Sequence, residues 1–158
     1  MRMSTVARLN MKHREKKRMK YYDDMGPGKG NCTFGIGALV HRGPCSAEEL
    51  VKTITDTQVE VAFDLRGAQA EQAIERNVHV ALTQAQCDAL VSLTFNRRPS
   101  GSFRAYELIN AGNLQGAANW IASLTHVMVR KNGRAVSVVA PGLIQRRIEE
   151  SAPFRTAR

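Results

Sequence analysis

The chain has 158 residues, of which 43% are hydrophobic and 23% charged, a composition that predicts a single soluble globular domain and excludes a disordered protein. The formal net charge of +9 favours a polyanionic partner: nucleic acid, anionic lipid or an acidic polymer of a cell envelope. Aromatic residues make up only 6% and are absent from the basic run Lys12–Lys20, so no nucleic acid is expected as a partner.

The N-terminal part is predicted to be a short helix followed by a small sheet. The helix covers residues 5–15 and has Ser4 available as its N-cap. Glycines then punctuate β-type residues from Tyr21 to Arg42, a pattern typical of a turn-rich sheet. We expect Thr33 on the first strand of this sheet.

Two capping signals predict the starts of the next helices. Ser46 with Glu49 opens a run of apolar residues at helical spacing, which Gly67 is expected to break or kink. Thr83 with Gln86 opens a second apolar helix that ends near Phe95. Short helices are expected at 103–110 and 114–123, the latter capped by Asn113.

Near the C-terminus the pattern changes to alternation between Val127 and Val138. The Asn132-Gly133 pair in the middle of this segment is a strong hairpin signal. Pro141 then starts a last helix over 142–150. No stretch approaches the roughly 18 apolar residues of a membrane span, so stable membrane insertion is not expected.

The three cysteines have no CxxC spacing, and no metal or cofactor is predicted. Cys32 and Cys45 flank a hairpin-like segment, where a disulfide or two free thiols are both compatible with the sequence. Cys87 falls on a helix face and is expected to be a small core residue.

Three polar residues near the N-terminus suggest chemistry: Glu15, Asp24 and Thr33. Glycosidic bond hydrolysis needs two carboxyl groups, an acid for the leaving oxygen and a base or nucleophile for the opposite face. A carboxyl sheltered at a helix end can keep its proton, while one in a wetter loop stays ionised. Spacing alone is more typical of a surface ion pair for Glu15 and a turn entry for Asp24 than of a catalytic pair.

The sequence around these residues resembles the active-site signature of phage-type lysozymes, glycoside hydrolase family 24. The residues that carry the resemblance are Glu15, Tyr22-Asp23-Asp24 and Thr33-Phe34-Gly35-Ile36-Gly37. It continues downstream through Leu82-Thr83, Gln86, Asp88-Ala89-Leu90-Val91-Ser92, Phe95-Asn96, Asn110-Ala111-Gly112-Asn113, Ala117-Ala118, Gly142-Leu143, Arg146-Arg147 and Glu149. Each motif is modest alone, but together they cover most of the chain in the family's order.

The resemblance implies an α+β, lysozyme-like fold in which one domain, 1–158, has a cleft between two lobes. The β-containing lobe would cover about 16–45 and the mainly helical lobe 46–158. Glu15 would be the general acid, Asp24 would stabilise the developing oxocarbenium charge and hold the attacking water, and Thr33 would position that water. The substrate would be the β-1,4 bond between N-acetylmuramic acid and N-acetylglucosamine in bacterial peptidoglycan.

Four further residues are candidates for substrate contact: Phe95, Asn96, Arg146 and Arg147. A buried aromatic ring and a structural amide are the favoured alternative for the first two. The arginines would either touch peptide carboxylates of the wall or be solvated on the last helix.

The sequence also departs from the family pattern. Lys16 stands where glycine is more usual after the acid, and three extra residues lie between Asp24 and Thr33. The segment around Asn132-Gly133 is longer than the usual connection. These departures concern the water site and the rim of the cleft rather than the role of Glu15.

The resemblance fits two biological settings, a phage endolysin or an antibacterial effector. Residues 1–20 lack the apolar core of a secretory signal, so we expect synthesis in the cytoplasm and delivery to the periplasm by a holin or a secretion apparatus. The enzyme would be a monomer, with an immunity or delivery protein as a further partner. Because the periplasm is oxidising, we expect the Cys32–Cys45 disulfide rather than two free thiols. The alternatives are a lytic transglycosylase and a non-catalytic basic module that binds envelope or nucleic acid.

Overall fold

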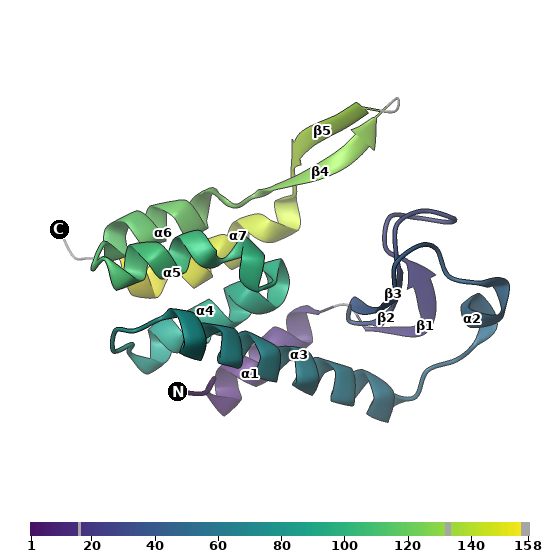
Figure 1. Ribbon diagram of the computed structural model, residues 1–158, viewed down its shortest axis with the longest axis horizontal. Helices are drawn as coiled ribbons and strands as arrows, with labels where there is room; N and C mark the ends of the chain where they lie inside the picture. Colours follow the sequence, from purple (N-terminus) through teal and green to yellow (C-terminus); the bar gives the residue numbers. More distant parts are fainter. Residues whose placement is uncertain (16, 132–133, 156–158) are drawn as a thin grey trace. The chain divides into compact units, whose positions relative to one another are not determined.

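The computed structural model describes residues 1–15, 17–131 and 134–155 and has two compact units (Figure 1). The N-terminal unit comprises Thr5–Gln69. The C-terminal unit comprises Met1–Ser4 and Ala70–Arg158, so the first four residues belong to the unit that the chain completes last. A small antiparallel sheet among many helices makes the fold α+β, as the sequence predicts.

The N-terminal unit consists of a helix, a three-stranded sheet and further helices. Its elements are α1 (Thr5–Arg14), β1 (Arg18–Asp23), β2 (Cys32–Gly35), β3 (Ala38–His41), α2 (Ala47–Val51) and the first part of α3 (Asp56–Asn77). The sheet is antiparallel in the order β1-β2-β3. The prediction that Thr33 lies on the first strand is wrong, because the basic segment before Asp24 forms a strand of its own and Thr33 lies on β2.

The helical run that begins at Ser46 is interrupted earlier than predicted. The capping box of Ser46 and Glu49 is confirmed and opens α2, but this helix already ends at Val51. Backbone pairing with β1 replaces the helix there, because the Ile54 N–H donates to the Met19 carbonyl at 3.0 Å. Gly67 lies inside the continuous helix α3, so the expected break at Gly67 is wrong.

The C-terminal unit packs helices around a central one. Its elements after α3 are α4 (Gln84–Arg97), η1 (Pro99–Gly101), α5 (Phe103–Asn110), α6 (Leu114–Ser123), β4 (His126–Lys131), β5 (Arg134–Val139), α7 (Pro141–Ser151) and η2 (Ala152–Phe154). The capping box of Thr83 and Gln86 and the Asn113 cap are confirmed. Of the described helices, none is long and apolar enough to cross a bilayer.

Helix α4 forms the centre of this core, because its side chains are buried around most of its circumference. Leu90 and Leu93 are fully buried, and so are Ile109 of α5 and Ile121 of α6. Cys87 is also buried and unbridged, as predicted, and burial raises the pKa of its thiol. The hairpin β4–β5 is confirmed on both sides of Asn132-Gly133, which lie outside the described residues.

The first four residues are fixed to the C-terminal unit by hydrogen bonds. The Met3 N–H donates to the Glu71 carboxylate at 2.9 Å. The Ser4 N–H and hydroxyl both donate to Asp88, each at 2.7 Å. These bonds join positions that are 68 and 84 residues apart in sequence.

A disulfide joins Cys32 to Cys45 in the N-terminal unit, which confirms the first of the two alternatives for these cysteines. The bond links the start of β2 to the residue that precedes the Ser46 cap, with the two Cα atoms 4.5 Å apart. It therefore closes the segment that contains β3 and fixes the entry to α2.

Reduction of this disulfide is expected to lower the free energy of unfolding by about 2–4 kcal/mol, because a link across 13 residues restricts the unfolded chain. Denaturant unfolding with and without reductant measures the change. A Cys87→Ala variant should respond as the parent does, whereas a Cys32→Ala/Cys45→Ala variant should not respond at all. An equal midpoint for oxidised and reduced parent protein would contradict the prediction.

Candidate active site

The three residues predicted for catalysis all lie in the N-terminal unit. Glu15 follows the last residue of α1, and its N–H donates to the Met11 carbonyl at 3.2 Å, which extends the helical pattern by one residue. Met11 is buried, so this end of the helix is anchored in the core. The Glu15 side chain is half-buried, in contrast to the exposed residues Lys12 to Arg14 before it.

Asp24 follows β1 and is held by Asn31 at the other end of the connecting loop. Its carboxylate accepts hydrogen bonds from the Asn31 N–H at 2.8 Å and the Asn31 side-chain amide at 3.2 Å. Gly30 is required beside it, since a Cβ there would lie 2.0 Å from the Asp24 Oδ1 atom. Gly30 also has a φ of +81°, which favours glycine. The loop therefore fixes an exposed carboxylate at the end of the strand.

Thr33 lies on β2 directly opposite Tyr22 of β1. Its side chain is buried, and its hydroxyl donates to the Tyr22 carbonyl at 3.1 Å. The hydroxyl hydrogen is therefore engaged in a hydrogen bond within the sheet. The hydroxyl oxygen keeps lone pairs that can accept a further hydrogen bond.

The extra residues between Asp24 and Thr33 form a closed loop. The Asp24 N–H donates to the Asn31 carbonyl at 3.1 Å, and the next pair of residues, Asp23 and Cys32, are partners in the β1–β2 ladder. The insertion is therefore accommodated beyond the ladder, and Asp24 remains attached to the same pair of strands as Thr33.

Asp23 is the site residue that the sequence reasoning missed. It is buried, and its carboxylate accepts hydrogen bonds from the Gly28 N–H at 2.6 Å and the Cys45 N–H at 2.7 Å. One side chain therefore connects the Asp24 loop to the disulfide. The only sequence signal is the doubled acid before a glycine-rich turn, which does not reveal which of the two carboxyl groups points inward.

Substitution of Asp23 by Asn is expected to lower the free energy of unfolding by about 1–3 kcal/mol, because the new amide group would set N–H against one of two backbone donors. Chemical denaturation measures this loss. Asp24→Asn is the matched control, since Asp24 is exposed, and it should leave stability within about 0.5 kcal/mol. Equal losses of stability in the two variants would count against the buried connection.

A pocket of about 520 Å³ opens beside this loop. Its lining residues are Arg18, Tyr22, Asp23, Asp24, Gly26, Pro27, Gly28 and Leu50. The Arg18 guanidinium lies over the Tyr22 ring, 4.2 Å from its centroid, which holds a cation and an aromatic face at the rim. Of the three predicted catalytic residues, all within the described chain, Asp24 lines this pocket whereas Glu15 and Thr33 do not.

The basic run Lys12–Lys20 is partly neutralised within the N-terminal unit. Lys12 forms an ion pair with Glu60 at 2.5 Å, and Lys17 pairs with Asp56. Both acids lie on α3, and the pairs are solvent-exposed. The described residues of the run are therefore mainly a solvated basic face.

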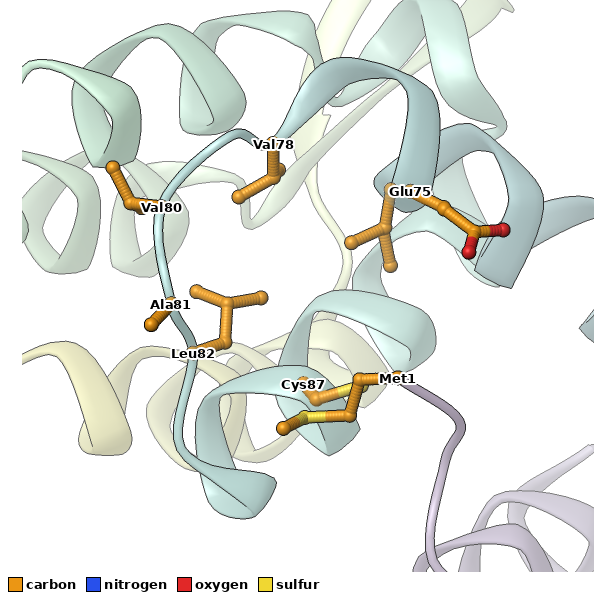
Figure 2. Close-up of a pocket in the computed structure, with 8 residues that line it drawn as sticks. Met1, Glu75, Val78, Val80, Ala81, Leu82 and Cys87 are labelled. Carbon is orange, nitrogen blue, oxygen red and sulfur yellow. The ribbon is translucent and has the colours of Figure 1, made fainter.

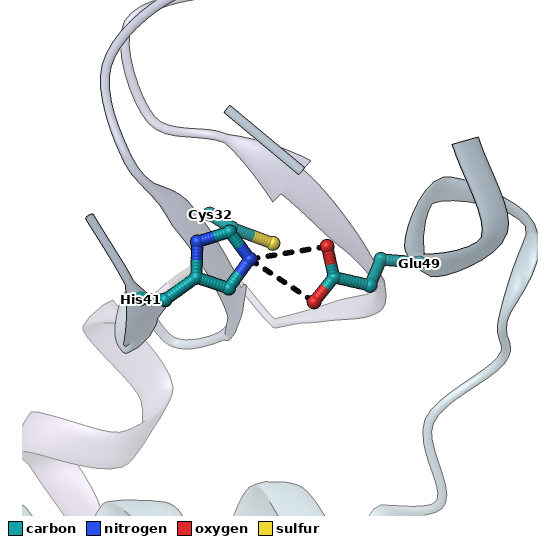
Figure 3. Close-up of side chains that lie close together, drawn as sticks. All are labelled: Cys32, His41 and Glu49. Atoms are coloured by element: carbon teal, nitrogen blue, oxygen red, sulfur yellow. Dashed lines mark hydrogen bonds and ion pairs between the residues drawn. The ribbon is translucent and has the colours of Figure 1, made fainter. Parts of the chain in front are cut away.

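Cys32, His41 and Glu49 lie close enough for their ligand atoms to fall within 4.8 Å of one another (Figure 3). The Cys32 sulfur is bonded to Cys45, however, so it offers no thiolate to a metal ion. His41 Nδ1–H donates to the Arg42 carbonyl and Nε2 lies 3.1 Å from the Glu49 carboxylate; these two contacts raise the pKa of His41 in that order. Glu49 also accepts the Ser46 N–H, so the group caps α2.

The four candidates for substrate contact lie in the C-terminal unit and are mostly internal. Phe95 is buried in the core. Arg147 is 1% exposed and donates to the Leu124 carbonyl at 3.1 Å, to the Asn96 side-chain oxygen and to Glu150. These contacts agree with the favoured alternative for the first two candidates, in which Phe95 is a buried aromatic ring and Asn96 a structural amide.

Both expectations for the two arginines are corrected, because neither is solvated or open to a wall peptide. Arg146 donates to Glu150 at 2.9 Å and to the Ser92 carbonyl at 3.1 Å, and it is 9% exposed. Burial is the main influence on Arg147 and lowers the pKa of its guanidinium, against the nearby Glu150 carboxylate. The pair forms a buried ion network around Glu150 and belongs to the core of the C-terminal unit.

A second pocket, of about 270 Å³, lies in the C-terminal unit between the end of α3 and α4 (Figure 2). Its lining residues are Met1, Ile74, Glu75, Val78, Val80, Ala81, Leu82 and Cys87. The lining is almost entirely aliphatic, so it offers few partners for the hydroxyl and amide groups of a glycan. The pocket beside Asp24 in the N-terminal unit, which is lined by charged and hydroxyl groups, fits a glycan better.

Comparison with known proteins agrees with this geometry. The phage lysozyme family model matches residues 12–150. The muramidase domain of SpmX from Asticaccaulis excentricus is 24% identical over 99% of each chain, with a TM-score of 0.72. An endolysin from Escherichia coli O157:H7 phage FAHEc1 is 25% identical over 98% of this chain and 93% of that one, also with a TM-score of 0.72. A variant of P22 lysozyme is 27% identical over 98% of each chain, with a TM-score of 0.64.

No curated protein matches the chain significantly. The family match nevertheless spans nearly the whole chain and includes Glu15, Asp24 and Thr33. The chain therefore belongs to the phage lysozyme family and is a glycoside hydrolase, a lysozyme of the muramidase class.

Proposed function

We propose that the chain hydrolyses the β-1,4 bond between N-acetylmuramic acid and N-acetylglucosamine with Glu15 as general acid and Asp24 on the opposite face of the sugar. The observation that carries the proposal is the placement of both carboxyl groups in one compact unit, with Asp24 fixed by Asn31. Glycoside hydrolysis requires such a pair.

In this mechanism Glu15 gives its proton to the glycosidic oxygen as the bond from that oxygen to the muramic acid C1 breaks. The glucosamine then leaves as an alcohol, and positive charge develops at C1 and the ring oxygen. The position of Glu15 suits this role, because the residue directly follows the last residue of α1 and is half-buried, unlike the exposed residues before it.

Asp24 supplies the negative charge that stabilises the oxocarbenium-like transition state. A water that donates one hydrogen to Asp24 and one to the Thr33 oxygen keeps a lone pair free to attack C1. The hydrogen bond from Thr33 to the Tyr22 carbonyl supports this assignment, because it leaves the Thr33 oxygen as an acceptor. As the new C–O bond forms, Asp24 takes up the proton that the water releases.

We infer that the enzyme works as a monomer on the cell wall outside the cytoplasm, after holin-dependent release or delivery by a secretion apparatus. The Cys32–Cys45 disulfide supports an oxidising workplace. The charge of +9 fits an envelope that carries acidic polymers and peptide carboxylates. Peptidoglycan is the partner, and an immunity or delivery protein would be a second one.

Digestion of purified peptidoglycan followed by mass analysis of the fragments tests the proposal. We expect reducing muropeptides, each of which has gained one water. Anhydro-muropeptides would instead identify a lytic transglycosylase, in which Asp24 and Thr33 have no water to hold. Absence of fragments, together with salt-sensitive DNA binding, would favour the non-catalytic basic module.

Asp24→Asn is expected to slow fragment release by about 10²-fold or more, because the amide neither balances the developing charge nor accepts the water proton. Glu48→Gln is the control, since Glu48 is an exposed acid on α2 of the same unit. Similar rates for Asp24→Asn and the parent enzyme would remove Asp24 from the mechanism.

A further inference from the structure

Three side chains that can bind a metal ion come together from three elements of the N-terminal unit. Cys32 and His41 are directly opposite each other in the β2–β3 ladder, so their side chains share a face of the sheet. Glu49 comes from α2, where it belongs to the capping box. Figure 3 shows the three side chains pointing toward one another. A sulfur, an imidazole nitrogen and a carboxylate oxygen therefore lie within 4.8 Å of one another.

The outer contacts of His41 and Glu49 orient their ligand atoms toward this point. The Nδ1–H of His41 donates to the Arg42 carbonyl at 3.1 Å, so Nε2 carries the lone pair of the neutral ring. Metal-binding histidines are commonly oriented by such a bond to a carbonyl. The Glu49 Oε2 atom accepts the Ser46 N–H at 2.7 Å, which fixes the carboxylate. Nε2 and Glu49 are then two bases 3.1 Å apart that share a cation, either a proton or a metal ion.

The third ligand depends on the state of the disulfide. In the oxidised chain Cys32 is bonded to Cys45 and offers no thiolate. A newly made chain has both thiols, and a dithiol reductant restores them by giving two electrons and two protons to the bond and becoming a disulfide itself. Cys32 is buried, but the side chains of His41 and Glu49 are 43% and 20% exposed, so an ion can enter beside them.

We propose that the reduced chain binds one Zn²⁺ through the Cys32 thiolate, the His41 Nε2 atom and the Glu49 carboxylate. Thiolate and imidazole ligands favour zinc over Mg²⁺ and Ca²⁺, and three protein ligands leave the fourth position of a tetrahedral site to water. With zinc bonds of about 2.0–2.3 Å, two ligand atoms lie about 3–4 Å apart, so the spacing needs only small side-chain adjustments. The ion displaces the thiol proton, which passes to solvent.

The zinc ion and the disulfide would be alternative links in the same part of the fold. The disulfide joins the start of β2 to the residue before the Ser46 cap, and the zinc ion joins β2 and β3 to α2 itself. Oxidation exchanges one for the other: the disulfide of an oxidant accepts two electrons, the Cys32–Cys45 bond forms and the ion is released. The strands thus stay joined to the α2 region before and after the disulfide has formed.

Zinc titration of the full chain under anaerobic conditions tests the proposal. The chain is reduced, freed of reductant and titrated beside the oxidised chain. We expect the reduced chain to bind one equivalent of Zn²⁺ about 100-fold more tightly than the oxidised chain does, and to show no such preference for Mg²⁺. Zinc should also raise the thermal unfolding midpoint of the reduced chain, because the folded state alone holds the ligands together.

Two single variants remove the same disulfide and differ only in the sulfur that remains. Cys45→Ala keeps Cys32 as a free thiol, so it should bind zinc without any reductant. Cys32→Ala lacks the ligand and should bind about 100-fold more weakly in either condition. Thermal unfolding without zinc shows whether both variants are folded. Equal zinc affinity of the two variants would overturn the proposal.

The other two ligands are tested in the reduced chain. His41→Gln and Glu49→Gln should each bind zinc about 100-fold more weakly, and glutamine at the latter position still completes the capping box. The matched controls are His79→Gln, Glu48→Gln and Cys87→Ala, the first two at exposed positions, and all should bind as the parent does. Parental affinity in both ligand variants, or equal affinity of the oxidised and reduced parent, would also overturn the site.

The zinc site is independent of the glycosidase mechanism, because none of its ligands is a predicted catalytic residue. Oxidised His41→Gln should digest purified peptidoglycan at the parental rate. Reduced Glu15→Gln should bind zinc as the reduced parent does. Failure of one proposal therefore leaves the other intact.

Discussion

Substitution of Glu15 by Gln is expected to reduce the rate of peptidoglycan hydrolysis by about 10³-fold, within the range of roughly 10²–10⁴ that a general acid contributes. The amide has nearly the same shape but no proton to give to the leaving oxygen. Because Glu15 follows the last residue of α1 and its backbone bond to Met11 is unaffected, the variant should fold as the parent does. The measurement is the initial rate of release of reducing ends from purified peptidoglycan.

Glu48→Gln is again the appropriate control, because it makes the same chemical change on an exposed residue of the same unit. It should retain the parental rate. A Glu15→Gln rate within threefold of the parental rate would assign Glu15 to the surface ion pairs of the basic run rather than to the chemistry.

The second large effect concerns the buried carboxylate of Glu150. Its substitution by Ala is expected to lower the free energy of unfolding by about 3–5 kcal/mol, because it leaves two cations in the core without a counter-charge. Glu150 is 2% exposed and contacts Arg146, Arg147 and the Ser92 hydroxyl, the last at 2.6 Å. Urea denaturation with a two-state analysis gives the value.

Two further variants separate the charge effect from loss of packing. Glu149→Ala removes a neighbouring acid that is only half-buried and should cost less than about 1 kcal/mol. An Arg146→Met/Arg147→Met/Glu150→Leu variant should recover much of the stability lost in Glu150→Ala, because it removes all three buried charges together. If the triple variant is less stable than Glu150→Ala, the network contributes through its geometry rather than by neutralising charge.

Local sequence signals predicted the helix starts well. Ser46 with Glu49, Thr83 with Gln86, and Asn113 each bond backbone N–H groups within three residues, so the information lies in a short window. The hairpin signal of alternating valines is equally local. These elements could therefore be identified without knowledge of their neighbours.

Features that depend on distant partners were missed. Strand β1 was hidden because it begins inside the charged run and exists through pairing with β2. The end of α2 depends on the bond from Ile54 to Met19, and the burial of Arg147 depends on Glu150 and Leu124. Long-range packing decides such cases, and a local pattern does not contain it.

The residues of the candidate site also divide into those that the sequence could identify and those that it could not. The family resemblance supplied Glu15, Asp24 and Thr33, and their roles remain a proposal. It included Asp23 only as a neighbour of Asp24, and it did not supply Gly30 or Asn31. These three residues hold the loop that contains Asp24. Residues that touch a substrate recur across a family, whereas residues that support an insertion belong to the individual chain.

The bonds from Met3 and Ser4 to the C-terminal unit affect the order in which the nascent chain folds. Ser4 leaves the ribosome 84 residues before its partner Asp88, a delay of roughly 4–17 s at typical rates of synthesis. All of Thr5–Gln69 is synthesised within that interval, so the unit that contains Glu15 and Asp24 can fold first. The C-terminal unit can be completed only after Asp88 has been synthesised, so it packs around residues that were made before the whole of the N-terminal unit.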